Sequence, residues 1–249
     1  GLKKEGFTIS TRGNMTTVTG NDGSGVIYGC RELIDHVGQY KDLKFPAQLT
    51  DAPEMVLRGG CVGIQKMEYL PGRGVYEYPY TPESFPWFYD KEQWIKYLDM
   101  LVENRMNSLY LWNGHPFASL VKLEEYPFAV EVDEETFKKN EEMFSFLTAE
   151  ADKRGIFVIQ MFYNILLSKP FAEHYGLKTQ DRNRPITPLI SDYTRKSVAA
   201  FIEKYPNVGL LVCLGEAMDT YEDDVEWFTK TIIPGVKDGL KELGRTDEP

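Results

Sequence analysis

A buried-strand pattern in this sequence ends at a carboxylate. The stretch LLVCLGEAMDT, at positions 210 to 220, runs apolar for five residues and then reaches Glu216, with Asp219 three residues later. A glutamate that leaves a buried strand for a closed pocket is partly desolvated, and desolvation raises its pKa. Glycoside hydrolysis requires such an acid, together with a second carboxylate that acts as nucleophile or base. We therefore predict that Glu216 is a general acid, although a helix cap or an ion pair with arginine would also explain it.

Polar and aromatic residues also mark three other apolar runs. We predict that they bind a carbohydrate, because rings stack on the apolar face of a pyranose while amides, guanidinium groups and carboxylates bond its hydroxyls. The predicted contacts are Arg58, Trp112, Asn113, His115, Gln160, Tyr163, Asn164 and Asp219. Three of them have an alternative. His115 is explained equally by a hydrogen-bonding group at the strand end or by a loop residue. Arg58 lies inside an apolar run, where a structural salt bridge explains it equally well, and Asp219 equally suits the N-cap of the next helix.

The connection at 65 to 89 is rich in tyrosine, phenylalanine and tryptophan, and it is longer than an ordinary loop. Long loops of this kind are often functional, but some of these rings must pack as the core of the loop. We therefore predict that the region contributes to the site, and we single out no ring in it. His115 has no second histidine or cysteine at ligand spacing, and the chain has no glycine-rich phosphate loop. Neither a metal nor another cofactor is expected.

The composition is that of a globular protein, and its charge restricts the partners. The chain has 249 residues, 42% of them hydrophobic, and a formal net charge of -10. This charge argues against nucleic acid, whose phosphates need clustered lysine and arginine. No apolar stretch reaches the roughly 18 residues of a membrane span. Cys30, Cys61 and Cys213 are not spaced as zinc ligands or as a disulfide framework, so we expect thiols in the core.

The hydrophobic pattern predicts a small first domain and then repeated units of strand and helix. A hairpin over 6–20 and a helix over 26–37, which Asp22 or Ser24 could cap, occupy the first part of the chain. Four apolar strands then alternate with amphipathic helices, at 55–64, 107–114, 156–165 and 207–216. Asp133 is the predicted cap of the helix at 134–154, and Pro234 is expected to kink or break the last helix. This alternation indicates a parallel sheet covered by helices. The GxGxxG fingerprint of open dinucleotide-binding sheets is absent after the first strand, which favours a (β/α)8 barrel.

Four such units make half of a barrel, because a complete barrel takes about 250 residues by itself. We therefore predict an α/β fold with a small, partial α/β domain at 1–50 and the N-terminal half of a (β/α)8 TIM barrel at 51–249. In such barrels the active site lies at the carboxyl ends of the strands. Part of the site, including the second carboxylate, is then expected beyond Pro249, and the fragment alone is expected to be inactive.

Several segments resemble known glycosidases. DGSGVIYGCRELIDHV, at 22 to 37, resembles the helix of the small domain that precedes the barrel in family 67 α-glucuronidases and family 20 β-hexosaminidases. MVLRGG, followed by WIKYLDMLVENRMNSLYLWNGHPF, resembles the opening of their catalytic barrels. The resemblance implies an acid at the end of strand four, at Glu216, and a strand-one arginine, Arg58, that contacts sugar hydroxyls. The chain departs from the hexosaminidases at Gly215, where they carry an aspartate, so an α-glucuronidase-like activity is preferred.

The leading prediction is a glycoside hydrolase with a carbohydrate substrate. The alternatives are a β-N-acetylhexosaminidase, a non-catalytic carbohydrate-binding protein that has kept the pocket, and an open-sheet enzyme of unrelated chemistry. Because proteins that process polysaccharides are commonly exported, a periplasmic or extracellular location is expected. The residues give no indication of the sugar, the linkage, the stereochemical outcome or the oligomeric state.

Overall fold

The computed structural model describes residues 1–73, 78–163, 165–181, 183–214, 218 and 220–246, and it divides into two compact units. Unit 1 contains Gly1–Gly60, Ile95–Ser108 and Glu150–Phe157. Unit 2 contains Cys61–Trp94, Leu109–Ala149 and Val158–Pro249. Unit 1 therefore extends beyond the small domain predicted at 1–50, because segments from three parts of the chain join it.

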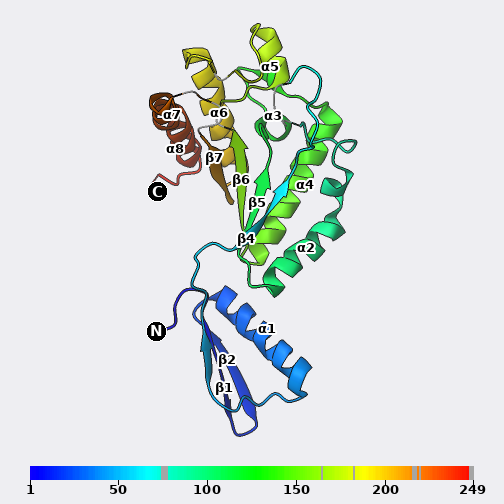
Figure 1. The fold of residues 1–249 in the computed structure, drawn as a ribbon, viewed down its shortest axis with the longest axis vertical. Helices are drawn as coiled ribbons and strands as arrows, with labels where there is room; N and C mark the ends of the chain where they lie inside the picture. Colours follow the sequence, from blue (N-terminus) through cyan, green and yellow to red (C-terminus); the bar gives the residue numbers. More distant parts are fainter. Residues whose placement is uncertain (74–77, 164, 182, 215–217, 219, 247–249) are drawn as a thin grey trace. The chain divides into compact units, whose positions relative to one another are not determined.

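Unit 1 begins with a three-stranded antiparallel sheet and one helix (Figure 1). The strands, in the spatial order β2-β1-β3, are β1 (Phe7–Arg12), β2 (Met15–Gly20) and β3 (Leu49–Asp51). The hairpin turns at Gly13, whose φ of 62° lies in the left-handed region that favours glycine. Helix α1 (Gly23–Tyr40) contributes Tyr28 to a core shared with Phe7 and Ile9. The predicted hairpin and helix are confirmed, and Asp22 is the N-cap.

Arg58 belongs to a buried ion pair in unit 1. Its Nη2 donates to Glu5 Oε2 at 2.8 Å and to the Tyr28 hydroxyl at 3.2 Å. Its Nε donates to the Arg105 carbonyl at 2.8 Å, and its Nη1 donates to the Met55 carbonyl at 2.7 Å. The guanidinium group is therefore occupied by protein partners on all its nitrogens. This pair is the structural salt bridge that was the alternative explanation for Arg58. The structure gives no support to the predicted contact of Arg58 with sugar.

Glu5 is held by further bonds that tie distant segments together. Asn107 Nδ2 donates to Glu5 Oε1 at 3.0 Å, and the backbone N–H of Glu5 donates to Asp22 Oδ2 at 2.7 Å. Asp22 also accepts from the N–H of Gly25 at 2.9 Å, in the first turn of α1. These two N–H groups hold the pKa of Asp22 below its usual value. One network thus joins the chain start, the start of α1 and the segments at Arg58 and Asn107.

The first strand of the second sheet begins later than the sequence predicts. Strand β4 covers Gly59–Gly63, whereas the apolar residues Met55, Val56 and Leu57 are exposed. Arg58 consequently precedes the strand, at its amino end, and the predicted position of Arg58 at the carboxyl end is wrong. A Cβ at Gly59 would lie 1.9 Å from the Ser108 carbonyl oxygen. The pair of glycines in this segment therefore reflects close backbone contact with the next strand.

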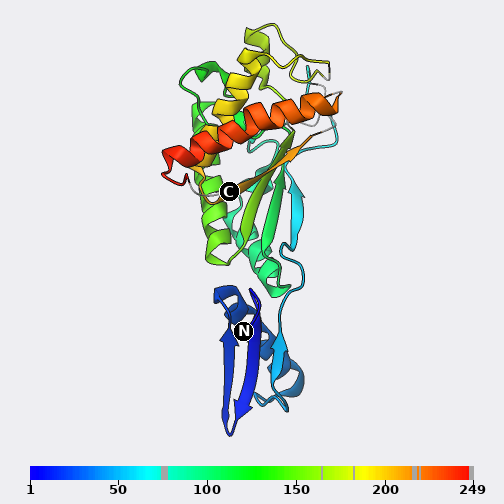
Figure 2. The ribbon, with the colours of Figure 1, turned by 90° about the vertical axis from the view of Figure 1, so that its left-hand side faces the viewer.

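The second sheet has four strands in the order of the chain. They run β4-β5-β6-β7, with β5 at Ser108–Trp112, β6 at Phe157–Tyr163 and β7 at Val208–Cys213. Strands β6 and β7 are parallel, with a register from Val158↔Val208 to Tyr163↔Cys213. Figures 1 and 2 show that β4, β5 and β6 point the same way. The alternation of strands and helices predicted from the hydrophobic pattern is confirmed as a mixed α/β fold with a parallel sheet.

The helices of the second half of the fold follow the strands. They are α2 (Lys91–Glu103), α3 (Phe117–Leu120), α4 (Glu134–Lys153), α5 (Lys169–His174), α6 (Pro188–Lys204), α7 (Tyr221–Trp227) and α8 (Ile233–Glu242), with short 3-10 turns at Pro86–Tyr89 and Pro127–Ala129. Asp133 caps α4 as predicted, because its Oδ1 accepts from the Thr136 N–H at 2.7 Å. No helix in the described part of the chain is long and apolar enough to cross a membrane.

The two faces of the second sheet differ in burial. Leu109, Leu111 and Phe162 are fully buried, and Phe162 packs on Phe117, which in turn contacts Phe201 of α6. The alternate residues on the opposite face are more accessible. They include Cys61, Tyr110, Trp112, Tyr163 and Leu211. We call this side the open face. The sheet thus has one face packed by helices and one apolar face that nothing in the described residues packs closely.

The cysteines do not lie in the core. Cys30 of α1 and Cys61 of β4 are exposed, and Cys213 at the end of β7 is half-buried. The prediction of core thiols is therefore wrong for Cys30 and Cys61. For Cys61 the reason is its position on the open face of the sheet, which an apolar sequence pattern does not distinguish from the buried face.

Pro234 does not break its helix. A π-helical turn at Phe228–Ile232 joins α7 to α8, and the Ile233 N–H bonds the Phe228 carbonyl. A proline cannot donate to the carbonyl four residues earlier, and the wider turn accommodates that loss. The predicted kink or break is thus replaced by a local widening. In α8, a Cβ at Gly239 would lie 2.7 Å from the Ala199 carbonyl oxygen, so the glycine permits close packing on α6.

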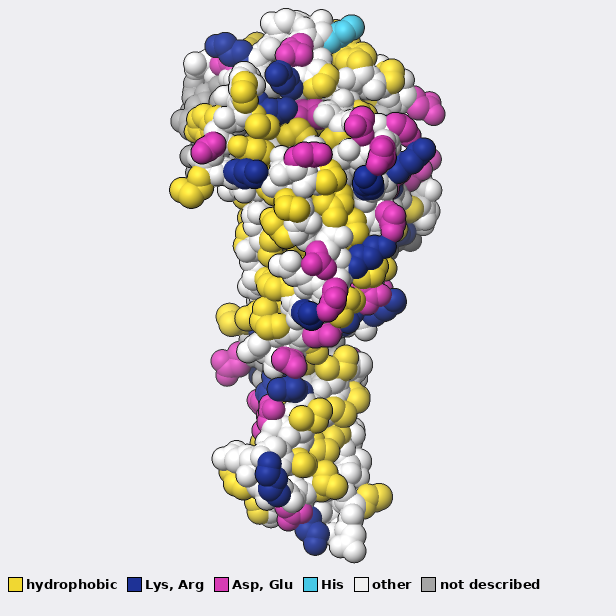
Figure 3. All heavy atoms as spheres, turned by 90° about the vertical axis from the view of Figure 1, so that its right-hand side faces the viewer, with side chains coloured by type: hydrophobic (Ala, Val, Ile, Leu, Met, Phe, Trp, Pro, Cys, Tyr) yellow, Lys and Arg dark blue, Asp and Glu magenta, His cyan; other side chains and the backbone are white. Residues whose placement is uncertain are grey.

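Charges of both signs are mixed on the surface shown in Figure 3, where lysine and arginine side chains alternate with aspartate and glutamate. Ion pairs of exposed side chains include Lys139 with Glu135 on α4 and Lys122 with Glu134. This face carries no continuous basic patch of the kind that binds nucleic acid.

Replacing Glu5 with glutamine should destabilise the fold by about 3 kcal/mol, because the change leaves the buried Arg58 charge uncompensated. Chemical denaturation of the full-length protein measures this. Glu135→Gln is the matched control, since Glu135 pairs with Lys139 on an exposed helix surface. The control should cost less than about 0.5 kcal/mol. Equal losses for the two variants would show that the Glu5 pair contributes no more than a surface pair.

Candidate active site

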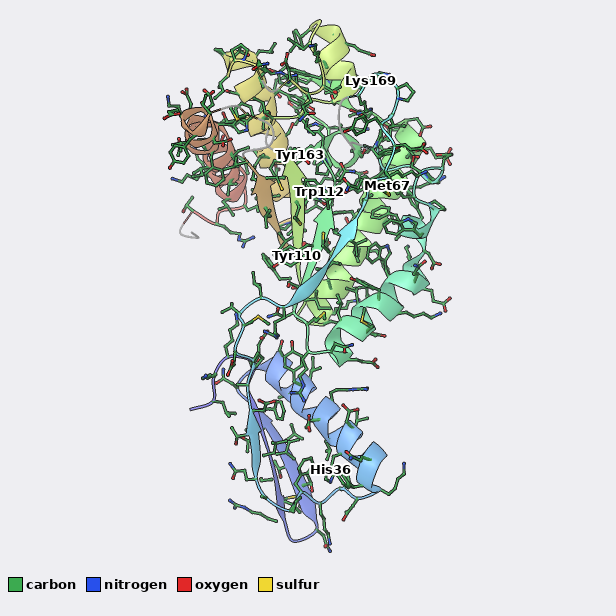
Figure 4. The ribbon with its side chains drawn as sticks, in the orientation of Figure 1. His36, Met67, Tyr110, Trp112, Tyr163 and Lys169 are labelled. Atoms are coloured by element: carbon green, nitrogen blue, oxygen red, sulfur yellow. The ribbon has the colours of Figure 1, made fainter. Side chains whose placement is uncertain are left out.

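The carboxyl ends of the four strands meet at one edge of the second sheet. The Ile64 N–H, just after β4, donates to the Trp112 carbonyl at 2.7 Å, and Tyr163 is paired with Cys213. On the open face the rings of Trp112 and Tyr163 make an edge-to-face contact, with centroids 4.9 Å apart and planes at 69°. Figure 4 shows both rings near the carboxyl ends of β5 and β6, with Tyr110 nearer the amino end. The structure therefore brings together two of the residues predicted to bind sugar.

Asn113 has a structural role at this edge. Its Nδ2 donates to the carbonyls of Ile64 and Tyr78, both at 2.8 Å, and its Oδ1 accepts from the His115 N–H at 3.0 Å. The side chain is fully buried. The amide therefore ties the start of the connection after β4, at Ile64, to its middle, at Tyr78. The predicted sugar contact of Asn113 is corrected, because its polar atoms face the backbone.

Gln160 lies on the helix-covered face of β6. Its Nε2 donates to the carbonyls of Leu111 at 3.0 Å and Met161 at 3.1 Å, and the side chain is fully buried. Tyr80 is fully buried, and this burial raises the pKa of its hydroxyl. The alternation of a strand turns Gln160 away from Tyr163 and the open face. Its predicted role in substrate binding is corrected for this reason.

His115 is a buried neutral imidazole. Its Nε2 lies 2.8 Å from the Tyr193 hydroxyl of α6, and its ring packs on Phe117. Burial, and to a smaller extent the charge of Arg73, lowers the pKa of His115 from 6.5 to about 3. The sequence expected a hydrogen-bonding group at a strand end, and the histidine bonds Tyr193 on α6. It links the β5 connection to α6 and does not reach the open face.

The aromatic loop is mostly its own core. Tyr80 and Phe88 are fully buried with centroids 5.1 Å apart, and Tyr78 and Phe85 pack at 5.9 Å. The Tyr78 hydroxyl also donates to the Glu68 carbonyl at 2.7 Å. These rings hold the loop to the sheet and are not available to stack on a sugar.

A second buried ion pair lies near this edge, and no sequence pattern predicts it. Arg73 donates through Nη1 to Glu131 Oε1 at 3.2 Å and through Nη2 to Oε2, and both side chains are about 5% exposed. The backbone N–H of Lys169 donates to the same Glu131 Oε1 at 2.6 Å. The carboxylate thus joins the loop after β4 to the start of α5. Residues 58 positions apart cannot be paired from spacing alone.

Three predicted residues, Asn164, Glu216 and Asp219, lie outside the described residues. Strand β7 ends at Cys213, three positions before Glu216 in the chain. The N-cap of α7 is Thr220, whose side chain accepts from the Asp223 N–H at 3.1 Å. Thr220 is thus the N-cap of the helix that follows Asp219 in the chain.

Comparison with solved structures gives a close match. The chain is 82% identical to a structure described as a GH138 enzyme targeting pectin rhamnogalacturonan II, over 98% of this chain, with a TM-score of 0.95. The chain is a relative of a glycoside hydrolase. It spans 28% of that relative's length. No protein-family model and no curated protein sequence matches it.

More distant structures share the fold of the chain. A GH20 β-N-acetylhexosaminidase from Streptomyces coelicolor A3(2) is 14% identical, with a TM-score of 0.62 over 96% of this chain and 51% of that one. A β-hexosaminidase from Streptomyces plicatus is also 14% identical, with a TM-score of 0.60 over 100% of this chain and 53% of that one. The expected likeness to family 20 is thus supported at the level of the fold. The expected family 67 likeness is not supported, and the GH138 match is more specific.

Acid should weaken the fold through His115. The unfolded chain binds a proton at this residue below its ordinary pKa of 6.5, whereas the folded chain does so only near 3. Between these pH values the free energy of unfolding should fall by up to about 1.4 kcal/mol per unit of decreasing pH. His115→Gln removes the titrating group, so the full-length variant should show a shallower loss of stability between about pH 6.5 and pH 4. Denaturation curves at several pH values measure this, and parallel slopes would contradict it.

Proposed function

We propose that this chain is part of a glycoside hydrolase that acts on a pectic glycan of the rhamnogalacturonan type. The observation that carries the proposal is the 82% identity, over 98% of the chain, to the enzyme that targets pectin rhamnogalacturonan II. Because the chain spans 28% of that relative, other parts of the protein contribute to the activity. The α-glucuronidase-like activity expected from the sequence is less well supported, since no described residue favours it.

The proposed architecture is the first half of a (β/α)8 barrel. Its support is the strand order β4-β5-β6-β7, which follows the chain without a reversal. An open doubly wound sheet reverses its strand order at a switch point, whereas a barrel does not. The second support is the open face, which carries large apolar side chains such as Tyr110 and Leu211. In a barrel this face is filled by layers of side chains from all eight strands.

The proposed reaction uses Glu216 as general acid. Glu216 lies three positions after Cys213 in the chain, and the carboxyl end of β7 lies at the edge where Trp112 and Tyr163 present their rings. Glu216 would donate its proton to the glycosidic oxygen as the bond to the anomeric carbon breaks. A second carboxylate from another part of the protein would act as nucleophile or as base toward water, and the separation of the two would set retention or inversion. Asn164 and Asp219 remain proposed contacts to sugar hydroxyls.

Two alternatives are weaker. A β-N-acetylhexosaminidase is disfavoured by Gly215, because the resemblance to that family implies an aspartate immediately before the acid. A non-catalytic sugar-binding protein would keep the Trp112 and Tyr163 rings but would not depend on Glu216. We also propose that the protein acts outside the cytoplasm, since a pectic polysaccharide is too large to cross a membrane unaided. We propose no oligomeric state.

Replacing Glu216 with glutamine in the full-length protein should reduce the hydrolysis of a pectic glycan by roughly 10²- to 10⁴-fold, the usual contribution of a general acid. Activated substrates that need no protonation of the leaving group should be affected less. Glu222→Gln, an exposed position in the first turn of α7, is the control and should keep wild-type turnover. Initial rates with both substrates measure the effect. Wild-type turnover by Glu216→Gln would exclude this residue as the acid.

Trp112→Ala should raise KM for the glycan about tenfold, because a ring that stacks on a sugar contributes more to binding than its neighbours do. Its half-buried position predicts a smaller effect on the melting temperature. Tyr40→Ala removes an exposed ring in unit 1 and is the control for loss of an aromatic side chain. If Trp112→Ala lowers the melting temperature strongly and leaves KM unchanged, the ring belongs to the core and not to the site.

A further inference from the structure

A cleft of about 510 Å³ lies beside the loop that follows β4. One wall is Pro71, Gly72 and Arg73, and the other wall comes from α5 and the segment after it. That second wall consists of Lys169, Ala172, Glu173, Leu177, Lys178, Thr179 and Gln180. Both walls follow strands of the second sheet at their carboxyl ends. Figure 4 shows Lys169 beyond the ends of β5 and β6, on the side where Trp112 and Tyr163 lie.

The walls of the cleft are fixed by a buried carboxylate. Glu131 accepts two bonds from Arg73 on one wall and one from the Lys169 N–H on the other. Such a pair is costly to desolvate and is stable only in good geometry, which the bidentate contact and the third donor supply. The cleft is therefore preorganised, because its two sides cannot separate without breaking these bonds.

The cleft carries more positive than negative charge. Lys169 extends across Gly72, since a Cβ at Gly72 would lie 3.8 Å from Lys169 Nζ. The Lys169 ammonium group forms a long ion pair with Glu173, at 3.8 Å, whereas Glu131 is bonded by the Lys169 backbone and by Arg73. The Lys178 ammonium group has no ion-pair partner in the part of the chain that the structure describes. The cleft thus presents two lysine ammonium groups and one glutamate, in a chain whose net charge is -10.

We propose that this cleft is a subsite for a uronic acid unit of the glycan, whose carboxylate is bound by Lys169 and Lys178. Pro71 and Leu177 offer apolar surface to the ring, while Gln180 offers an amide to its hydroxyls. This inference rests on the proposed function and adds a distal contact to it, away from the bond that Glu216 would cleave. An acidic glycan approaching a chain of net negative charge needs such a local cationic site, because long-range repulsion opposes binding elsewhere.

The test compares an acidic ligand with its uncharged form. The probes are a trimer of galacturonic acid and the same trimer as its methyl ester, titrated by calorimetry into the full-length protein in the Glu216→Gln background. The protein without lysine changes should bind the acid more tightly than the ester. Lys169→Met and Lys178→Met should each weaken binding of the acid about fivefold, and together more than tenfold, with no change for the ester.

Lys138→Met on the exposed surface of α4 is the matched control, and it should leave both affinities unchanged. Melting temperatures of all variants show whether the fold is preserved. Equal affinity for acid and ester, no binding of either, or the same loss for both in the lysine variants would each overturn the subsite. Hydrolysis of pectic glycans by the wild-type protein is a separate measurement. Its absence would refute the proposed function while the binding data still decide on the cleft.

Discussion

The buried amide of Asn113 is the interaction on which the functional edge of the sheet depends. It binds the carbonyls of Ile64, at the start of the connection after β4, and of Tyr78, in its middle, and it also accepts from the backbone of His115. A buried amide with three partners is expensive to disrupt, because each partner would be left unsatisfied without water. The long aromatic loop is therefore held in one position on the sheet. Its buried rings pack against one another, and the rings of Trp112 and Tyr163 are accessible on the open face.

Two buried arginine–glutamate pairs play a similar part in the two units. Arg58 and Glu5 are 53 positions apart and join segments of unit 1, while Arg73 and Glu131 are 58 positions apart and join segments of unit 2. Each arginine also sits next to glycine, where the backbone must pass close to another element or turn sharply. Because both charges must be desolvated, such a pair adds little net stability to the fold. A buried charge without its partner is strongly destabilising, so any fold that separates the two residues is disfavoured. The two pairs therefore determine which segments of the chain come together. At the carboxyl edge of the sheet, the Arg73–Glu131 pair holds the two walls of the cationic cleft in place.

The two faces of the second sheet differ in which side chains are accessible. Alternation places Leu109, Leu111 and Phe162 under helices and leaves Tyr110, Trp112 and Tyr163 accessible. A sheet with one covered face and one apolar accessible face is incomplete as a fold, and this agrees with a chain that spans 28% of its closely similar relative. The Trp112 and Tyr163 rings and the cationic cleft all lie within the described residues.

The sequence by itself determined the element types and their order, because hydrophobic periodicity and capping residues act locally. The hairpin at Gly13, the caps at Asp22 and Asp133 and the four strand regions follow from it. Only the tertiary structure decided which polar residue meets which partner. Arg58, Asn113 and Gln160 were all predicted to bind sugar. Each donates instead to backbone carbonyl groups, and Arg58 also pairs with the distant Glu5. The alternation of side chains along a strand assigns its residues to two faces of the sheet. Which of these faces is covered depends on packing against elements distant in the sequence, and a local pattern contains no information about that packing.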